Sequence, residues 1–246
     1  MKIVIIVQAR MGSTRFPGKI LKTINNQPML IFQYKRLQRS KLSSLVCVAT
    51  TNEKSDDIIN ELCLENNIPV FRGSETDVLK RYHDAANYFN ADVVVRINSD
   101  CPLIDPSEVD KVINEWINSN PRVDYASNIL EETFPLGMHT EVFSIQALEK
   151  AQAEARLSDE REHVTPYIYR NPSIFNLQSI VNNENLSHYR WTVDYPEDLD
   201  FVREVANNLI PKENFGMMEV VELINAKPNL KKINNMYKKR QNILQK

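Results

Sequence analysis

The first nineteen residues constrain the fold more than any other stretch of the chain. Residues Ile3–Val7 form an unbroken run of β-branched apolar side chains, which predicts a central strand buried on both faces of a sheet. The run ends abruptly in a loop that carries two glycines, two hydroxyl side chains and three cations. A buried strand that leads directly into such a loop indicates an α/β protein with a ligand site at this edge of its sheet.

The composition of this loop predicts an anion-binding site. Gly12 lets the backbone approach a ligand closely, and Ser13 offers hydroxyl and amide donors. Arg10, Arg15 and Lys19 supply fixed charge, which suits a polyphosphate better than a single carboxylate. The alternative is an ordinary glycine-bearing turn. The loop matches neither G-x-x-x-x-G-K-[ST] nor G-x-G-x-x-G, so a P-loop NTPase and a dinucleotide-binding dehydrogenase are both disfavoured.

Alternating strand and helix patterns continue along the chain. Strands are predicted over residues 45–50, 68–71, 92–97, 124–127, 134–143, 175–181 and 189–194, and helices over 28–41, 55–64, 76–89, 106–119, 148–157, 196–208 and 215–226, with a further helix from 158. This order predicts a single doubly wound, mostly parallel α/β sheet with right-handed crossovers.

Composition excludes several classes of protein. The 246 residues are 42% hydrophobic with a net charge of −2, which fits one α/β domain and no nucleic-acid partner. No apolar stretch is long enough to span a membrane, and the amino terminus does not fit a signal peptide. Three spaced cysteines, Cys47, Cys63 and Cys101, fit reduced thiols and a cytoplasmic location. Cys101 is interpreted as a packed residue rather than a nucleophile.

The last twenty residues differ in composition from the rest. Residues 227–246 contain seven Lys or Arg and no Asp or Glu. A basic tail can contact nucleic acid, but the apolar spacing here favours a packed or frayed terminal helix. We therefore expect one main domain over residues 1–226 and a basic C-terminal helix or tail over 227–246.

Two aspartates follow predicted strands at the same edge as the cationic loop. Asp100 lies just beyond the strand over 92–97, and Asp194 ends a later strand and precedes Pro196. Two carboxylates that converge on one sheet edge, together with phosphate oxygens, are suitable ligands for one Mg²⁺. Asp105 is interpreted as a helix cap. The alternative for Asp100 is a turn aspartate that binds no metal.

Two further groups of residues leave alternatives open. His139 and Glu141 would share one face of a strand, where they could hydrogen-bond a substrate, pair structurally or bind metal. Gly73, Ser74 and Arg81 would lie near the carboxyl end of the third strand, where ligands bind in open α/β sheets. The same segment also fits a capped helix start without a ligand.

Together these motifs resemble the cytidylyltransferases that make CMP-activated acid sugars, the CMP-Kdo and CMP-sialic acid synthetases. The resemblance spans roughly residues 2–205 and is strongest to the SpsF-like branch of spore-coat polysaccharide biosynthesis. Residues 8–19 are similar to the family's nucleotide-binding signature, 100–104 to its central metal motif and 193–199 to its carboxyl-terminal motif. Residues 160–166 are similar to a segment typical of the SpsF-like branch.

The resemblance implies a nucleotidyltransferase domain with a Rossmann-like, GT-A-like fold of the nucleotide-diphospho-sugar transferase type. It implies CTP as co-substrate, Mg²⁺ dependence, a small-molecule sugar acceptor and a homodimer, with residues 130–190 as the acceptor-binding and dimerisation region. The implied nucleotide contacts are Ala9, Arg10, Gly12, Ser13, Arg15, Lys19, Gly73, Ser74, Arg81 and Asp100, with Asp100 and Asp194 on the metal.

The acceptor side is assigned less directly. His139, Glu141, Arg161 and His163 are the predicted substrate contacts, with His163 or His139 as base on the acceptor hydroxyl. The acceptor-binding residues of the sialic-acid and Kdo enzymes have no match here, so the acceptor does not transfer with the resemblance. Three alternatives remain: a glycosyltransferase of the same broad fold, a nucleotidyltransferase acting on a phosphorylated or phosphonate acceptor, and a catalytically silent nucleotide-binding regulator.

Overall fold

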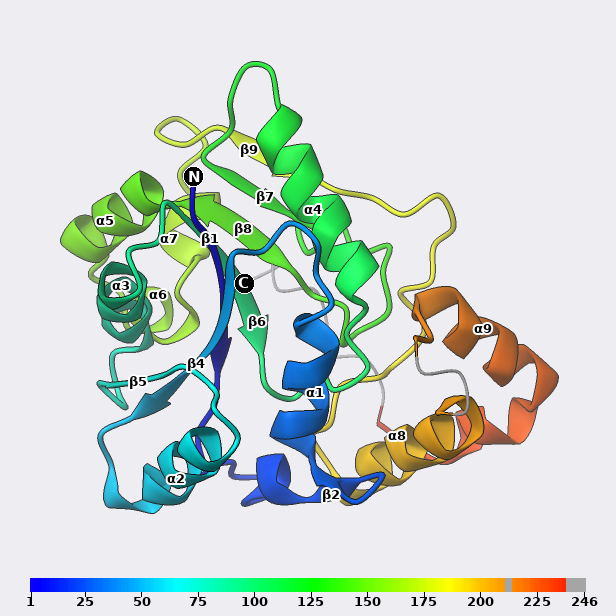
Figure 1. The fold of residues 1–246 in the computed structure, drawn as a ribbon. Coiled ribbons are helices and arrows are strands. Elements are labelled where there is room, and N and C mark those ends of the chain that lie inside the picture. Colours follow the sequence, from blue (N-terminus) through cyan, green and yellow to red (C-terminus); the bar gives the residue numbers. More distant parts are fainter. Residues whose placement is uncertain (211–213, 238–246) are drawn as a thin grey trace.

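A seven-stranded sheet forms the centre of the computed structural model, which describes residues 1–210 and 214–237 (Figure 1). Its strands are β1 (Ile3–Gln8), β4 (Leu45–Thr51), β5 (Val70–Gly73), β6 (Val93–Asn98), β7 (Tyr125–Ser127), β8 (Glu141–Ser144) and β9 (Leu177–Ser179), in the order β5-β4-β1-β6-β8-β7-β9. The pairs around β1, β4, β5 and β6 are parallel, β8 is antiparallel to both neighbours, and β9 is parallel to β7. The predicted mostly parallel α/β class is confirmed.

Helices cover both faces of this sheet (Figure 1). They are α1 (Met29–Leu37), α2 (Asp57–Glu65), α3 (Val78–Tyr88), α4 (Pro106–Asn118), α5 (Ile145–Glu154), α6 (Ser158–His163), α7 (Pro166–Tyr169), α8 (Pro196–Leu209) and α9 (Met217–Ala226), with the 3-10 helices η1 (Lys19–Leu21), η2 (Lys54–Asp56) and η3 (Pro228–Lys232). Alternate side chains of β1 point to opposite faces. Ile5 and Val7 therefore pack with α1, α4, α8 and α9, whereas Val4 and Ile6 pack with α3, α5 and α7.

The amino-terminal half follows the predicted order with shifted boundaries. The strands predicted over 45–50 and 92–97 are β4 and β6. The strand predicted over 68–71 lies two residues further along as β5, so Gly73 ends a strand instead of sitting in a turn. A small hairpin of β2 (Thr23–Ile24) and β3 (Gln27–Pro28), which the sequence did not indicate, precedes α1.

Two strands predicted in the second half of the chain differ from the structure. The segment over 134–143 becomes a strand only at Glu141, which leaves His139 in the preceding loop. The segment before Asp194 is no named strand in the described residues and makes an isolated β-bridge, between Leu136 and Arg190. Extended loops and strands share the same backbone region, so only ladder pairing, a tertiary property, separates them.

Residues beyond α9 are packed onto the domain as far as the structure describes them. Leu230 of η3 joins the core cluster that contains β1, and Asn234 is buried. Of the predicted basic C-terminal helix or tail, residues 238–246 lie outside the described residues. Among the described helices, none has the length and apolar character needed to cross a membrane.

Candidate active site

The loop that follows β1 is held in a compact shape that directs one cation inward. The carbonyl of Met11 accepts from the amide of Gly18 at 3.2 Å, and the amide of Met11 donates to Asp56, next to α2, at 2.8 Å. Gly18 has a left-handed φ of 66°, a conformation that favours glycine, and Lys19 follows it as the first residue of η1. Lys19 is thereby turned toward the interior and is only 9% exposed.

Lys19 connects the loop to both aspartates that were predicted to share an edge. Its ammonium nitrogen lies 3.1 Å from Asp100 Oδ2 and 3.4 Å from Asp194 Oδ1, and it donates to the carbonyl of Val193 at 2.6 Å. Residues more than 80 positions apart in the sequence therefore meet at one point. The structure confirms that the loop and the two aspartates lie together at the carboxyl end of the sheet.

Asp194 is surrounded by cations. Its Oδ1 accepts from Arg15 at 2.6 Å, and its Oδ2 accepts from Arg190 at 3.0 Å. Burial of this carboxyl opposes its ionisation, but the charges of Lys19, Arg190 and Arg15 outweigh burial and hold the pKa of Asp194 below its usual value. Asp194 is therefore an ionised carboxylate at neutral pH.

The two carboxylates fit the predicted Mg²⁺ site in their chemistry. Within residues 1–210 and 214–237, no group of three or more His, Cys, Asp or Glu side chains is arranged to hold a metal. Mg²⁺, however, usually takes one or two protein carboxylates and completes its shell with substrate phosphates and water. Asp100 and Asp194 on a common cation match that pattern, and Lys19 would have to turn toward the phosphates for both carboxylates to ligate an ion.

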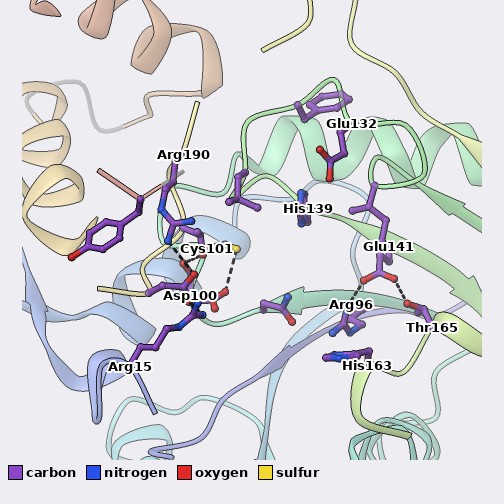
Figure 2. A pocket seen from close by; sticks show the side chains of 18 of the residues that line it. Arg15, Arg96, Asp100, Cys101, Glu132, His139, Glu141, His163, Thr165 and Arg190 are labelled. Carbon is purple, nitrogen blue, oxygen red and sulfur yellow. Dashed lines mark hydrogen bonds and ion pairs between the residues drawn. The ribbon is translucent and has the colours of Figure 1, made fainter. Parts of the chain in front are cut away.

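A cavity of about 1060 Å³ opens beside the aspartates. Figure 2 shows Arg15, Asp100 and Arg190 gathered at one end and His139 and Glu141 at the other. The remaining lining residues include Arg96, Asn98, Cys101, Glu132, His163, Thr165, Tyr169 and Arg170. Cys101 is buried, and burial raises the pKa of its thiol well above the ordinary value, which agrees with a packed thiol rather than a nucleophile.

The far end of the cavity rests on a buried ionic network. Glu141 accepts from Arg96, from the Thr165 hydroxyl and, at 2.9 Å, from the Tyr125 hydroxyl. Burial alone would lower the pKa of Arg96, but the carboxylate of Glu141 more than offsets burial and raises it. Of the three alternatives for Glu141, this geometry favours structural pairing.

Two histidines line the cavity in different settings. His139 is half-buried, and burial lowers its pKa despite the opposing charges of Glu141 and other acids, so the ring is neutral at pH 7. His163 is exposed at the end of α6, where Val164 has a left-handed φ of 73° that ends the helix before α7 begins. Either ring is placed to meet a ligand in the cavity.

Arg161 is placed away from the cavity that it was predicted to serve. Its guanidinium donates to Asp77 and, from both terminal nitrogens, to Gln152. These bonds join α6 to the start of α3 and to α5, and Arg161 is not among the cavity-lining residues. In the structure Arg161 joins helices, and its predicted substrate contact stays a prediction.

The predicted base and ribose contacts lie across the loop from the aspartates. Arg10 is 3.9 Å from Glu75, and a Cβ on Gly12 would lie 3.9 Å from the same side chain. Arg81 is 2% exposed and donates to the carbonyl of Ser74. The loop and the β5–α3 turn therefore face each other, as a nucleotide site between them requires.

The nucleotide-side predictions differ in how far the structure supports them. Arg10, Gly12 and Arg15 are exposed and Ser13 is half-buried, so these residues are open to a ligand. Ala9 is buried, and its amide donates to the carbonyl of Ala49. At Gly73 a Cβ would lie 2.9 Å from Arg81, so this glycine makes room for a neighbouring side chain. The roles of all these residues stay predictions.

Sequence reasoning missed several residues of the site. Arg96, Asn98, Arg190 and Tyr237 line the cavity, and Asp198 holds Arg190. Asp198 lies within the carboxyl-terminal motif, three residues into a helix that begins at Pro196, so its position as a helix-capping acid was readable from the sequence. Arg96 and Tyr237 carry no local signal because their partners, Glu141 and Glu197, are distant in the chain. The partners of Arg190 are only four and eight residues away, within the same motif.

Comparison with known sequences gives a family match over nearly the whole chain. A family model described as cytidylyltransferase matches residues 4–240. An uncharacterized protein of Methanocaldococcus jannaschii is 37% identical over 96% of this chain and 95% of its own length. The spore coat polysaccharide biosynthesis protein SpsF of Bacillus subtilis is 30% identical over 92% and 95%. A 3-deoxy-manno-octulosonate cytidylyltransferase of Trichlorobacter lovleyi is 35% identical over 48% and 46%.

Solved structures agree with this match. A cytidylyltransferase from Leptospira borgpetersenii has a TM-score of 0.90 and 37% identity, and the alignment covers 98% of this chain and 100% of that one. A CMP:2-keto-3-deoxy-manno-octonic acid synthetase in complex with CTP has a TM-score of 0.63 and 18% identity over 85% and 99%. The second likeness shows the fold alone.

Proposed function

The chain belongs to the cytidylyltransferase family, and from this premise we propose that it transfers CMP from CTP to a hydroxyl of an acidic sugar. The acceptor is of the 2-keto-3-deoxy or nonulosonic type, pyrophosphate is released, and the product serves surface polysaccharide or glycan synthesis. The names of two relatives support this choice, one in spore-coat polysaccharide synthesis and one acting on 3-deoxy-manno-octulosonate.

One observation carries the proposal. Lys19 of the cationic loop contacts Asp100 and Asp194, which line a cavity of about 1060 Å³. A triphosphate over the loop would place its α-phosphorus near the two carboxylates, with the acceptor in the cavity beyond them. An in-line attack by an acceptor hydroxyl needs this arrangement, and positioning supplies a large part of such a rate enhancement.

The cations of the loop would change partners when CTP binds. Arg15 and Lys19 now neutralise Asp194, and phosphate oxygens are stronger competitors for a guanidinium or an ammonium group. Once turned, both cations stabilise charge that grows on the phosphate oxygens as pyrophosphate leaves. Asp100 and Asp194 would hold Mg²⁺, and a bound ion would supply further charge neutralisation.

The cavity offers polar groups for a polyhydroxylated acceptor. Asn98 and His163 can hydrogen-bond hydroxyl groups, and neutral His139 can accept the proton of the attacking hydroxyl. Arg170 lies at the cavity edge in an ion pair with Asp159 that is about one third exposed, so its charge is available to an acidic acceptor.

Pyrophosphate release tests the reaction directly. The full chain is incubated with Mg²⁺ and each of the four nucleoside triphosphates against a panel of Kdo-like and nonulosonic acids, neutral sugars and sugar phosphates. Release that requires CTP and one acid sugar supports the proposal and identifies the acceptor. Release with a sugar phosphate would replace the acceptor class, and consumption of a nucleotide sugar without release would move the assignment to glycosyl transfer.

Substitution of single aspartates distinguishes a specific role of Asp194 from a general effect of removing negative charge. Asp194→Asn should abolish Mg²⁺-dependent release, whereas Asp200→Asn, an exposed aspartate of α8, should retain it. Equal release by both variants would contradict the metal role of Asp194. A cytoplasmic location and a homodimer are parts of the same proposal, and sedimentation of the purified chain tests the second.

A further inference from the structure

A buried carboxylate lies behind the proposed metal ligand. Asp198 has no exposed surface, and both of its oxygens are fully engaged. Oδ2 accepts from Arg190 Nη2 at 2.8 Å and from the amides of Asp194 and Tyr195 at 2.9 and 3.1 Å. Oδ1 accepts from Arg190 Nε and from Asn234 Nδ2, both at 2.9 Å. The paired bonds leave Arg190 one orientation.

Arg190 transmits this fixed position to Asp194. The same Nη2 that contacts Asp198 also donates to Asp194 Oδ2 at 3.0 Å. The backbone amide of Asp194 is held by Asp198 as well, so both the main chain and the side chain of Asp194 are oriented by one buried pair. Asp194 Oδ1 remains directed at Lys19 and Arg15.

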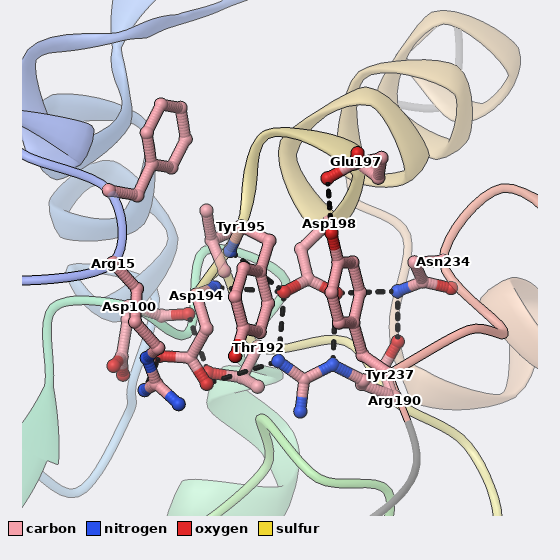
Figure 3. A network of polar contacts seen from close by, with 12 residues as sticks. Arg15, Asp100, Arg190, Thr192, Asp194, Tyr195, Glu197, Asp198, Asn234 and Tyr237 are labelled. Atoms are coloured by element: carbon pink, nitrogen blue, oxygen red, sulfur yellow. Dashed lines mark hydrogen bonds and ion pairs between the residues drawn. The ribbon is translucent and has the colours of Figure 1, made fainter.

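The C-terminal segment completes this arrangement (Figure 3). Asn234 is 5% exposed, and its Nδ2 donates both to Asp198 and to the carbonyl of Arg190, at 3.1 Å. The ring of Tyr237 stacks on that of Tyr195 with centroids 3.8 Å apart and planes 4° from parallel. These contacts come from residues beyond the last helix of the predicted main domain.

We propose that Asn234 is a positioning residue of the nucleotidyl-transfer site, acting through Asp198 and Arg190 on the carboxylate of Asp194. This inference rests on the proposed function, because it gives Asp194 the role of metal ligand. Tyr237 lines the acceptor cavity and holds Tyr195 next to the guanidinium of Arg15, 5.3 Å from the ring. Within the described residues, the segment over 227–237 is thus part of the proposed active site.

The physical reason is that a metal ligand must be held as well as charged. A carboxylate that can rotate has to lose that freedom when the ion binds, whereas one fixed by surrounding hydrogen bonds does not. Loss of Asn234 removes one bond to Asp198 and one to the backbone of Arg190 while no charge changes. The effect therefore falls on the geometry of Asp194 and not on its attraction for a cation.

Metal binding in the absence of turnover tests the proposal. Binding of Mn²⁺ to the full-length chain is followed by electron paramagnetic resonance with CTP present and no acceptor. Asn234→Ala should weaken Mn²⁺ binding about 2- to 10-fold, as expected if the two lost hydrogen bonds together affect Asp194 by the equivalent of about one direct bond. The matched control is Asn235→Ala, since Asn235 is exposed, and it should bind Mn²⁺ as wild type does.

A second variant keeps the positive charge at position 190, between Asp198 and Asp194. Arg190→Lys keeps a cation beside Asp198 but cannot form the paired bonds, and it should weaken Mn²⁺ binding roughly 10- to 100-fold. CTP binding in the presence of EDTA, measured by calorimetry, should change less than about 2-fold in both variants, since the loop is untouched. Circular dichroism confirms that each variant is folded before titration.

The outcomes distinguish failure of the positioning role from failure of the proposed metal site. If the wild-type chain binds Mn²⁺ and both Asn234→Ala and Arg190→Lys bind it equally well, the positioning role is overturned. The proposed function then stands. Absence of Mn²⁺ binding by the wild-type chain with CTP overturns the proposed metal site and with it this inference. Weaker CTP binding without metal, parallel to the loss of Mn²⁺ binding, would also overturn the inference, because it indicates a general disturbance of the site.

Discussion

Glu141→Gln tests whether the far end of the cavity is a structural support or a substrate contact. Glu141 is 3% exposed, Arg96 beside it is 11% exposed, and the hydroxyls of Tyr125 and Thr165 donate to the same carboxylate. The substitution preserves shape and removes one charge. Arg96 is then left buried with an uncompensated charge, because its other polar partner is the neutral Gln8.

The expected cost follows from this burial. Removing one partner of a buried ion pair destabilises a protein by about 3–5 kcal/mol, since the remaining charge loses its compensation. For a chain of this length, about 1 kcal/mol corresponds to roughly 2–4 °C in Tm, so the melting temperature should fall by about 6–20 °C. An exposed pair would give less than about 1 kcal/mol.

Urea unfolding followed by tryptophan fluorescence measures the change, because Trp116 and Trp191 are both buried. The control is Glu61→Gln on α2, where the side chain is exposed and the unfolding midpoint should match that of wild type. A loss below about 1 kcal/mol with Glu141→Gln, together with a raised KM for the acceptor, would refute the structural interpretation and favour the substrate contact.

Three further predictions address the site and its surroundings. Lys19→Met should lower kcat for pyrophosphate release roughly 100-fold, because it removes a charge that stabilises the leaving group. The control Lys22→Met, at an exposed position, should retain activity. Equal kcat values for the two variants would exclude that role of Lys19. Gly137→Ala should destabilise the fold by about 1–3 kcal/mol or more in urea titration, because Gly137 has a φ of 114° and a Cβ would lie 2.8 Å from a backbone carbon. Gly12→Ala, whose Cβ would lie in ordinary contact 3.9 Å from the Glu75 side chain, should cost far less, and a similar loss in both would contradict the steric argument. For His139 the folded pKa is depressed by burial, so the unfolded chain binds more protons and stability falls as pH drops below about 6.5. His139→Gln should flatten this fall below about pH 6.5 in thermal melts, and parallel curves would assign the fall to other groups.

The site works with charges that neutralise one another before any ligand is bound. Lys19 and Arg15 compensate Asp194, while Asp198 compensates Arg190. On the proposed function, CTP and Mg²⁺ would replace the loop's ion pairs together, because phosphates attract the cations and the metal takes the carboxylates. Pairs that exchange in this way need a fixed frame, and the buried Asp198 and Arg190 are suited to provide it.

Sequence reasoning was most successful where the signal is local. The run Ile3–Val7 predicted a buried strand because its side chains must leave water on both faces, and β1 lies between β4 and β6 as that requires. Asp105 was interpreted as a helix cap from its place before Pro106, and it accepts from the amide of Ser107 at 2.8 Å. Glycine content, caps and apolar runs act within a few residues, so a sequence displays them.

The boundaries of strands and the partners of side chains were harder to predict from the sequence. Gly73 was placed in a turn and lies in β5, and His139 was placed in a strand and lies in a loop, because pairing with a neighbouring strand decides both. Arg161 was assigned to the substrate from its neighbourhood in a motif, yet its guanidinium binds Asp77 across 84 positions of sequence. A long side chain reaches whichever acid packing brings near, and the motif does not specify that acid.

The sequence by itself determined the α/β fold, the cationic loop and the two candidate aspartates, because each is signalled by residues close together in the chain. Only the tertiary structure decided which groups support them. Asn234 reaches Asp198 across 36 positions, and Met236 and Tyr237, in the segment expected to be a packed or frayed terminal helix, form part of the cavity wall. Composition reports the charge of a segment, but its burial depends on the surface that the rest of the fold presents to it.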